Sequence, residues 1–135
     1  MALMDIPDLT ATFSSVRRVL VAGGKFVFSI LHPCFFTPFN AENPPEDLDE
    51  EGNFKALRVT RYGLEGKWFS DGDGMCGTLG SHHRTLSTYL NTLSASKFQL
   101  EEVSEPLAPV LEATAKRRES IVPTLLIAKS TALPT

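Results

Sequence analysis

The chain has 135 residues and a formal net charge of −3, with 42% hydrophobic and 21% charged residues. This composition is typical of a single soluble globular domain, and its negative balance argues against a partner held through the phosphates of a nucleic acid. No apolar run approaches the roughly 20 residues that span a bilayer, and two distant cysteines without a CxxC spacing favour a cytoplasmic protein with free thiols.

The first 36 residues predict a helix followed by a buried strand. Apolar side chains recur every three or four positions from Pro7 to Ala22, which is typical of an amphipathic helix. The pair Gly23-Gly24 supplies a left-handed end for that helix. The apolar run from Lys25 to Leu31 then predicts a short strand buried on both faces. Together they resemble the second half of a βαβ unit whose first strand would precede the helix.

Residues 37–81 are predicted to be less regular. The segment from Asn43 to Asn53 is acidic and rich in proline, which favours an exposed loop. Short strands are predicted at Leu57 to Tyr62 and at Lys67 to Phe69, with Trp68 as an anchor. An irregular segment of this length inside a small domain is more often a lid or a binding loop than an idle connector.

Regular structure is expected again over residues 82–130. We expect an amphipathic helix from Thr85 to Ser96 and a half-polar strand from Phe98 to Glu105, near a sheet edge. A short helix from Pro109 to Arg118 and an apolar strand from Thr124 to Lys129 complete the prediction. Residues 131–135 are expected to form a tail.

The segment from Gly72 to Gly77 matches the letters of a dinucleotide fingerprint, GxGxxG. Such a fingerprint needs a buried strand before it and a long helix after it, and the flanks WFSD and TLGSHH supply neither. A flexible glycine loop is the better interpretation. A calcium loop starting at Asp71 also fails, because its twelfth position is His82 instead of glutamate.

The histidines allow several interpretations. His82 and His83 precede a helix together with Arg84, where they could hydrogen-bond locally or contact a polar or anionic ligand. With His32 and Cys34 they could complete a zinc site, although nothing in their spacing requires one. A nucleophilic role for Cys34, with His32 as its base, competes with that of a buried structural thiol.

Several stretches resemble one enzyme family in order and spacing. They are MALMDIPDL at the start, RVL before the two glycines, FVFSILHPCF, and HRTLSTYL, followed by the strand from Phe98 to Pro106 and the strand from Pro123 to Lys129. This arrangement is similar to the class I S-adenosylmethionine-dependent methyltransferases, in the branch that contains the ubiquinone- and menaquinone-biosynthesis type. Lys97 stands where that family usually has glycine.

The resemblance implies an α/β fold that is the C-terminal half of a Rossmann-like methyltransferase sheet. Its strands would be numbers five, seven and six of the family, with strand seven antiparallel between the others. The glycine-rich cofactor loop and the acidic residue of the family lie N-terminal to the matched region. We therefore expect a truncated domain that is inactive alone, in which Met1, Ala2, Leu3 and Met4 remain from the wall that binds S-adenosylmethionine.

The resemblance also places a small-molecule methyl acceptor at the carboxyl end of the strand Lys25 to Leu31, where the chain turns at His32-Pro33. His32 and His83 are the candidates for proton transfer, and packing alone remains the alternative for the HPCFF stretch. An inactive fragment or pseudoenzyme that binds a partner, or a second copy of itself, through the open edge of this strand is the rival interpretation. The residues expected to face the acceptor are His32, Pro33, Phe35, Tyr62, Trp68, His82, His83 and Arg84.

Overall fold

The main sheet has three strands in the order β1-β7-β6. The computed structural model describes residues 2–42, 44–110 and 117–135. Strand β7 is antiparallel to both of its neighbours, with Phe28 opposite Ala128 in the register with β1. This order and direction confirm the predicted arrangement of strands five, seven and six. The strands are β1 (Lys25–Leu31), β6 (Phe98–Ser104) and β7 (Leu125–Ala132).

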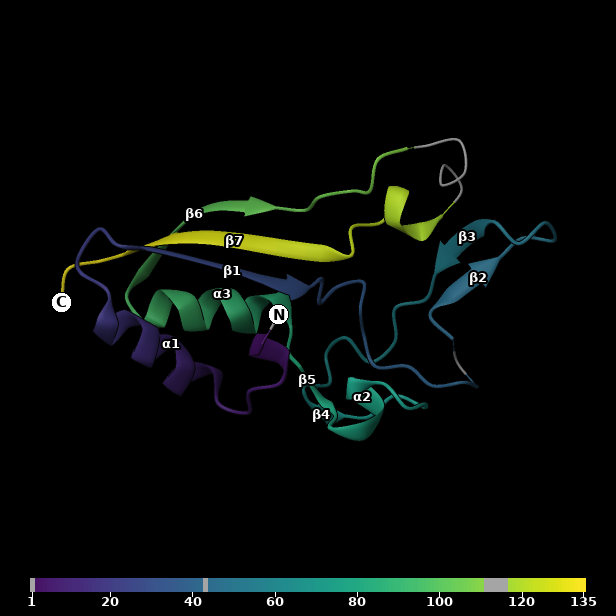
Figure 1. Ribbon diagram of the computed structural model, residues 1–135, viewed down its shortest axis with the longest axis horizontal. Coiled ribbons are helices and arrows are strands. Elements are labelled where there is room, and N and C mark those ends of the chain that lie inside the picture. Colours follow the sequence, from purple (N-terminus) through teal and green to yellow (C-terminus); the bar gives the residue numbers. More distant parts are fainter. Residues whose placement is uncertain (1, 43, 111–116) are drawn as a thin grey trace.

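Two helices, α1 (Leu9–Val19) and α3 (Leu86–Ala95), lie on the same side of this sheet (Figure 1). The helix α1 is shorter than predicted at both ends. It begins after Asp8, whose carboxylate accepts a hydrogen bond from the N–H of Ala11 at 2.8 Å, so an N-cap and not Pro7 sets the start. The chain then turns at Gly23, whose φ of +82° requires the freedom of glycine.

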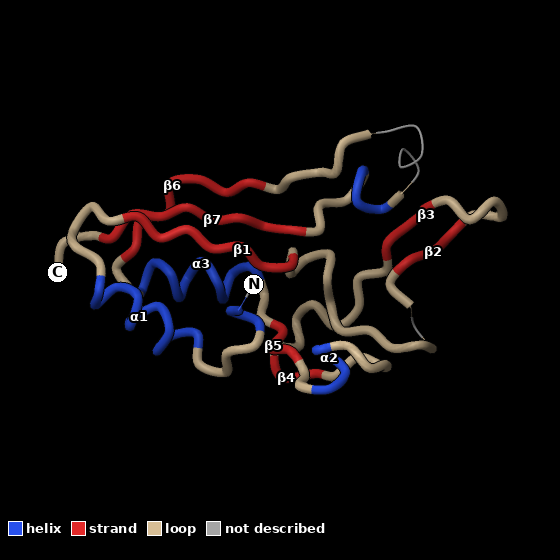
Figure 2. The backbone as a smooth tube through the Cα atoms, viewed as in Figure 1, coloured by secondary structure: helices blue, strands red, loops and turns tan. Residues whose placement is uncertain are grey.

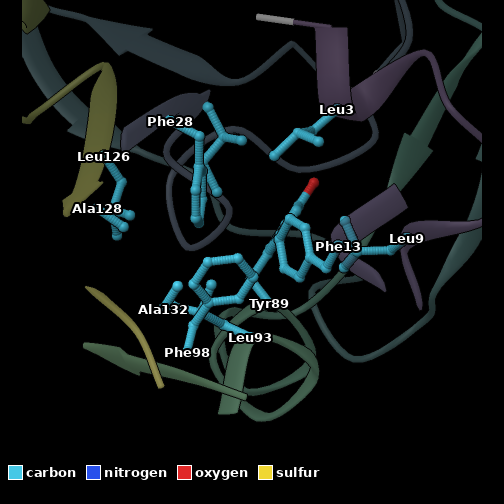
Figure 3. Close-up of a cluster of buried hydrophobic side chains, with 11 residues drawn as sticks. Leu3, Leu9, Phe13, Phe28, Tyr89, Leu93, Phe98, Leu126, Ala128 and Ala132 are labelled. Carbon is cyan, nitrogen blue, oxygen red and sulfur yellow. The ribbon is translucent and has the colours of Figure 1, made fainter. Parts of the chain in front are cut away.

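The core lies between the two helices and the sheet. Phe13 of α1 is fully buried, and its ring lies 5.6 Å from that of Phe26 and 5.5 Å from that of Phe28. Figure 3 shows Phe13 and Phe28 converging with Tyr89 and Leu93 of α3. The apolar stripe read from the sequence therefore faces the core as expected.

Strand β1 departs from its prediction on one point. It was expected to be buried on both faces, yet Val27 is 55% exposed while Phe28 is buried. The reason is that both long helices cover one face, and within the described residues no helix covers the other (Figure 2). Only one edge of β1 is paired in the described part of the chain, because β7 is its single neighbour.

Residues 45–58 form a hairpin where a loop was predicted. Strand β2 (Glu46–Leu48) pairs with β3 (Phe54–Leu57), and Asp49 closes the turn by accepting the N–H of Asn53 at 2.7 Å. The expected strand from Leu57 to Tyr62 is wrong, because pairing ends at Leu57. The loop was predicted from the acidic composition of this segment, and strand pairing was not considered. An aspartate that closes a turn is itself a feature of hairpins.

A second small sheet follows, formed by β4 (Gly66–Trp68) and β5 (Ser81–His83). Between them the GxGxxG stretch leads into α2 (Met75–Thr78), a single turn of helix. A Cβ atom at Gly77 would lie 2.0 Å from the carbonyl oxygen of Gly72, so the glycine there allows a close approach of backbone. The buried strand and long helix of a dinucleotide fingerprint are not formed over these described residues.

The remaining elements are short. A 3₁₀ turn, η1 (Ala2–Met4), precedes α1, and another, η2 (Arg118–Ser120), precedes β7. The helix predicted from Pro109 to Arg118 falls largely on residues 111–116, outside the described residues. No helix in the described ranges is long and apolar enough to cross a membrane.

Candidate functional site

A pocket of about 460 Å³ lies at the carboxyl end of β1. We call it the β1-end pocket. The turn η1 and the residue after it form one wall, the end of β1 and the loop that follows form the second, and α2 with the start of β5 forms the third. Most of the pocket surface is apolar. The lining residues are Met4, Asp5, Leu31, Phe36, Met75 and Cys76, together with Ala2, Gly80 and Ser81.

Arg84 fixes the wall formed by η1. Its side chain is buried, and its guanidinium donates to the carbonyl oxygen of Leu3 at 3.0 Å, of Ile6 at 2.5 Å and of Pro7 at 3.0 Å. Charge-assisted hydrogen bonds of this kind are among the stronger ones in proteins. Because Leu3 belongs to η1, which also carries Met4, and Ile6 and Pro7 belong to the segment that leads from η1 to α1, Arg84 holds this part of the chain against the start of α3.

Predicted acceptor-facing residues meet in a second, much smaller cavity beside the β1-end pocket. It measures about 10 Å³, room for about one water molecule. The two spaces share Met4, Leu31, Phe36 and Ser81. The predicted residues that line the small cavity are Met4, Pro33, Trp68, His82, His83 and Arg84.

His83 is positioned by Tyr62. The Nε2 of His83 lies 2.8 Å from the carbonyl oxygen of Tyr62, to which it donates, and the two rings meet edge to face at 6.0 Å. The hydroxyl of Tyr62 accepts the N–H of Leu86 at 2.9 Å, which ties it to the start of α3. Burial raises the pKa of Tyr62, with the Leu86 N–H acting in the opposite sense. Tyr62 thus supports the histidine and lines neither of the two spaces.

His32 is engaged through both ring nitrogens. Its Nδ1 accepts the N–H of Cys34 at 3.2 Å, and its Nε2 lies 2.5 Å from a carboxylate oxygen of Glu105. The ring of Phe35 packs on the imidazole at 4.5 Å. His32 is only 2% exposed, so it ties the end of β1 to the segment that follows β6. Neither His32 nor Phe35 lines the β1-end pocket or the small cavity.

Two titratable residues near the pocket, His82 and Asp5, differ in their surroundings. Burial lowers the pKa of His82, and Arg84 and Lys67 lower it further, whereas Asp5 acts in the opposite sense. His82 is therefore uncharged near neutral pH. The carboxylate of Asp5 is exposed and has no hydrogen-bond or ion-pair partner among the described residues.

The other predicted residues have different places. Leu3 belongs to the core and Met1 lies outside the described residues. Trp68 separates the small cavity from an open hollow of about 580 Å³ that Phe39 also lines. Cys34 and Cys76 are free thiols, and no group of three or more histidine, cysteine or acidic side chains suited to a metal converges in the part of the chain that the structure describes.

Sequence reasoning missed Asp5, Phe36, Met75 and Cys76 as pocket residues. Asp5 lies within the DIPDL stretch that carries the family resemblance, so its position beside the predicted cofactor wall could have identified it. Met75 and Cys76 lie inside the GxGxxG stretch, where the glycine pattern drew attention away from the residues between the glycines.

Comparisons with known proteins give a sequence relative and several related structures, two of which are described below. No family model matches the chain. An uncharacterized protein of Haemophilus influenzae is 27% identical over 106 residues, which are 76% of this chain and 39% of that protein. The chain thus spans well under half of this curated relative.

The solved structures match nearly the whole chain. A Listeria monocytogenes protein, assigned provisionally as an S-adenosylmethionine-dependent methyltransferase, is 29% identical with a TM-score of 0.72, over 99% of this chain and 59% of that one. An S-adenosylmethionine-dependent methyltransferase of Mesorhizobium loti is 31% identical with a TM-score of 0.74, over 97% and 58%. The chain has the fold of part of a Rossmann-like methyltransferase, and it spans less than two thirds of either neighbour.

Proposed function

We propose that this chain forms the acceptor side of an S-adenosylmethionine-dependent methyltransferase that acts on a small molecule. The observation that carries the proposal is the apolar pocket at the carboxyl end of β1, in a fold similar to two solved methyltransferases. Ligands of open α/β sheets bind at the carboxyl ends of the parallel strands, and pockets of this size accept small molecules.

The residues of η1 fit the part assigned to them. Ala2 and Met4 present apolar surface to the β1-end pocket, and such a surface suits the methionine portion of the cofactor. When bound, S-adenosylmethionine supplies an electrophilic methyl group. The chain's own part is to hold the acceptor in line with that group and to exclude water, which accounts for much of the acceleration in displacements of this kind. His83, fixed by Tyr62, and the neighbouring His82 and Trp68 line the small cavity beside this pocket, and we propose that they flank the acceptor from there.

The rest of the cofactor site is proposed to come from residues that correspond to the unmatched part of the two neighbours, including the glycine-rich loop. Their matched parts are only 58% and 59% of their chains. A domain completed in this way would also provide a partner for the free edge of β1. The membership in the ubiquinone- and menaquinone-type branch belongs to the same proposal and rests on the HPCF and HRTLSTYL stretches.

A second candidate function is binding of a partner chain or a second copy through the β1 edge. It is favoured by one observation: β1 pairs on one side only among the described residues. Such an edge is a template for further strand pairing.

Ultraviolet crosslinking with methyl-labelled S-adenosylmethionine tests the proposed function. We expect label in the peptides that carry Met4, Phe36 or Met75, and we expect excess S-adenosylhomocysteine to remove it. The variant Met4→Gln should reduce the labelling, whereas Val19→Gln, at a position that is 74% exposed on α1, should leave it unchanged. Labelling that ignores the competitor, or that maps elsewhere, would reject the proposal.

A further inference from the structure

The lining of the β1-end pocket contains one acidic side chain. Among the described residues that line it, Asp5 alone carries a formal charge at neutral pH. The other lining residues are apolar, sulfur-bearing or small, and they include Met4 of η1, Met75 of α2 and Phe36 from the loop after β1. A single carboxylate in an apolar pocket favours a ligand that combines an apolar body with a positive charge.

The nearby cations do not neutralise Asp5. The guanidinium of Arg84 donates to the backbone carbonyls of Leu3 in η1 and of Ile6 and Pro7 after it, and Arg84 lines the small cavity instead of the β1-end pocket. The ammonium of Lys67 lies over the ring of Phe69, 5.4 Å from its centroid. His82 stays uncharged near neutral pH, because burial lowers its pKa. No ion pair with Asp5 is formed by these groups in the described part of the chain.

We infer that the β1-end pocket binds an apolar cation through Asp5, and that the methyl acceptor is an amine with an apolar or aromatic body. The role of the amine as methyl acceptor rests on the proposed function, whereas the binding of an apolar cation at Asp5 does not. The apolar body would contact Phe36 and the thioethers of Met4 and Met75, since thioethers pack well against rings. Asp5 would receive the ammonium and disfavour a carboxylate in the same place.

The size of the effect follows from the exposure of Asp5. Exposed ion pairs contribute about 0.2–1 kcal/mol, so a pair with the exposed Asp5 should change affinity by about 1.4- to 5-fold. The same positive charge has two possible sources, the amine of an acceptor and the sulfonium of the cofactor. Probes that carry only one of these groups distinguish them.

Methionine methyl NMR provides the test on the intact chain labelled with methyl-13C methionine. The chain has three methionines, and two of them line the pocket. The probes are 2-phenylethylammonium, the neutral isostere 2-phenylethanol, the anion 3-phenylpropionate, and trimethylsulfonium. We expect saturable shifts of the Met4 and Met75 methyl signals with 2-phenylethylammonium, at an affinity about 1.4- to 5-fold higher than for the alcohol.

Two variants separate the charge of Asp5 from general effects. Asp5→Asn should bring the affinity for the amine down to that for the alcohol. Asp8→Asn removes a charge three residues away but keeps an oxygen that can cap α1, so it should leave both affinities unchanged.

Equal binding of amine and alcohol, or an Asp5→Asn variant that behaves like the original chain, would overturn the inference. An Asp5-dependent shift with trimethylsulfonium but not with the amine would overturn the amine acceptor and assign the charge to the cofactor. Failure of the crosslinking experiment alone would remove the proposed function and leave the amine site standing.

Discussion

Arg84 and the carbonyl oxygen of Leu3 are joined by a hydrogen bond of 3.0 Å, although 81 residues separate them in the sequence. This bond and its two companions to Ile6 and Pro7 connect the start of α3 to the turn that carries Met4. The guanidinium therefore stabilises η1, which forms one wall of the β1-end pocket. The family stretches MALMDIPDL and HRTLSTYL meet physically at this residue.

The variant Arg84→Ala should lower the free energy of unfolding by about 3 kcal/mol, because it leaves three carbonyl groups without their buried, charged donor. Arg84→Lys should lose less, since a lysine keeps the charge but not the planar fork. Urea unfolding measures both losses, and the exposed Arg18→Ala on α1 is the control, expected within about 0.5 kcal/mol of the original chain. A stable Arg84→Ala variant with an unshifted Met4 methyl signal would contradict this role.

Lys97 occupies a left-handed conformation, with a φ of +63°, directly after the end of α3. Glycine adopts this conformation without the steric cost of a Cβ atom. We expect Lys97→Gly to raise the free energy of unfolding by about 1 kcal/mol, as at other helix ends of this type. Thermal unfolding measures the gain. Lys97→Ala, which keeps the Cβ atom, should give none, and an equal gain for both variants would show that loss of the lysine side chain is the cause.

Lower pH should destabilise the chain through His82. Burial lowers its pKa in the folded state below the ordinary value of about 6.5, so the unfolded state binds more protons between the two values. The free energy of unfolding should therefore fall as the pH decreases through about 6.5, until the pKa of the folded state is passed. His82→Gln should flatten this part of the pH profile, measured by urea unfolding at several pH values. Parallel profiles for the two proteins would disprove the assignment to His82.

The edge of β1 that is unpaired among the described residues should make the chain self-associate. Val27 is exposed in the middle of this strand, and charged side chains on edge strands oppose pairing with another chain. Sedimentation velocity should show association that grows with concentration in the original chain and is reduced in Val27→Lys. Val19→Lys, at a position on α1 that is more exposed than Val27, should associate like the original. A monomer at every concentration tested would argue against an open edge.

The main sheet and both long helices could be predicted because their signals are strong and local. The run from Lys25 to Leu31 gave the bounds of β1 as the structure has them, and the apolar stripe of α1 identified the face that carries Phe13. The strand order came from the family resemblance, since local pattern does not specify which strands are neighbours. The error at β2 arose because an acidic segment with a turn-closing Asp49 resembles a loop when its pairing partner is not known.

The site was harder to predict because its contacts join residues that are distant in the sequence. Sequence pattern marked His32 as a pocket residue, but its burial and its bond to Glu105 depend on a segment 73 residues away. Asp5 and Met75 line the same pocket only because η1 and α2 both lie at the end of β1. Contacts between such short elements have no periodic pattern that a single sequence could reveal.

The central claim is that η1 and the end of β1 form one side of a site for S-adenosylmethionine. Titration of the methyl-13C methionine-labelled chain with S-adenosylhomocysteine tests it most directly, with adenosine as the control ligand. We predict a saturable shift of the Met4 methyl signal, with a dissociation constant on the order of 1 mM for a site that holds one side of its ligand, and no comparable shift with adenosine. A Met4 signal that stays unmoved up to saturating ligand, or that responds equally to adenosine, would contradict the claim.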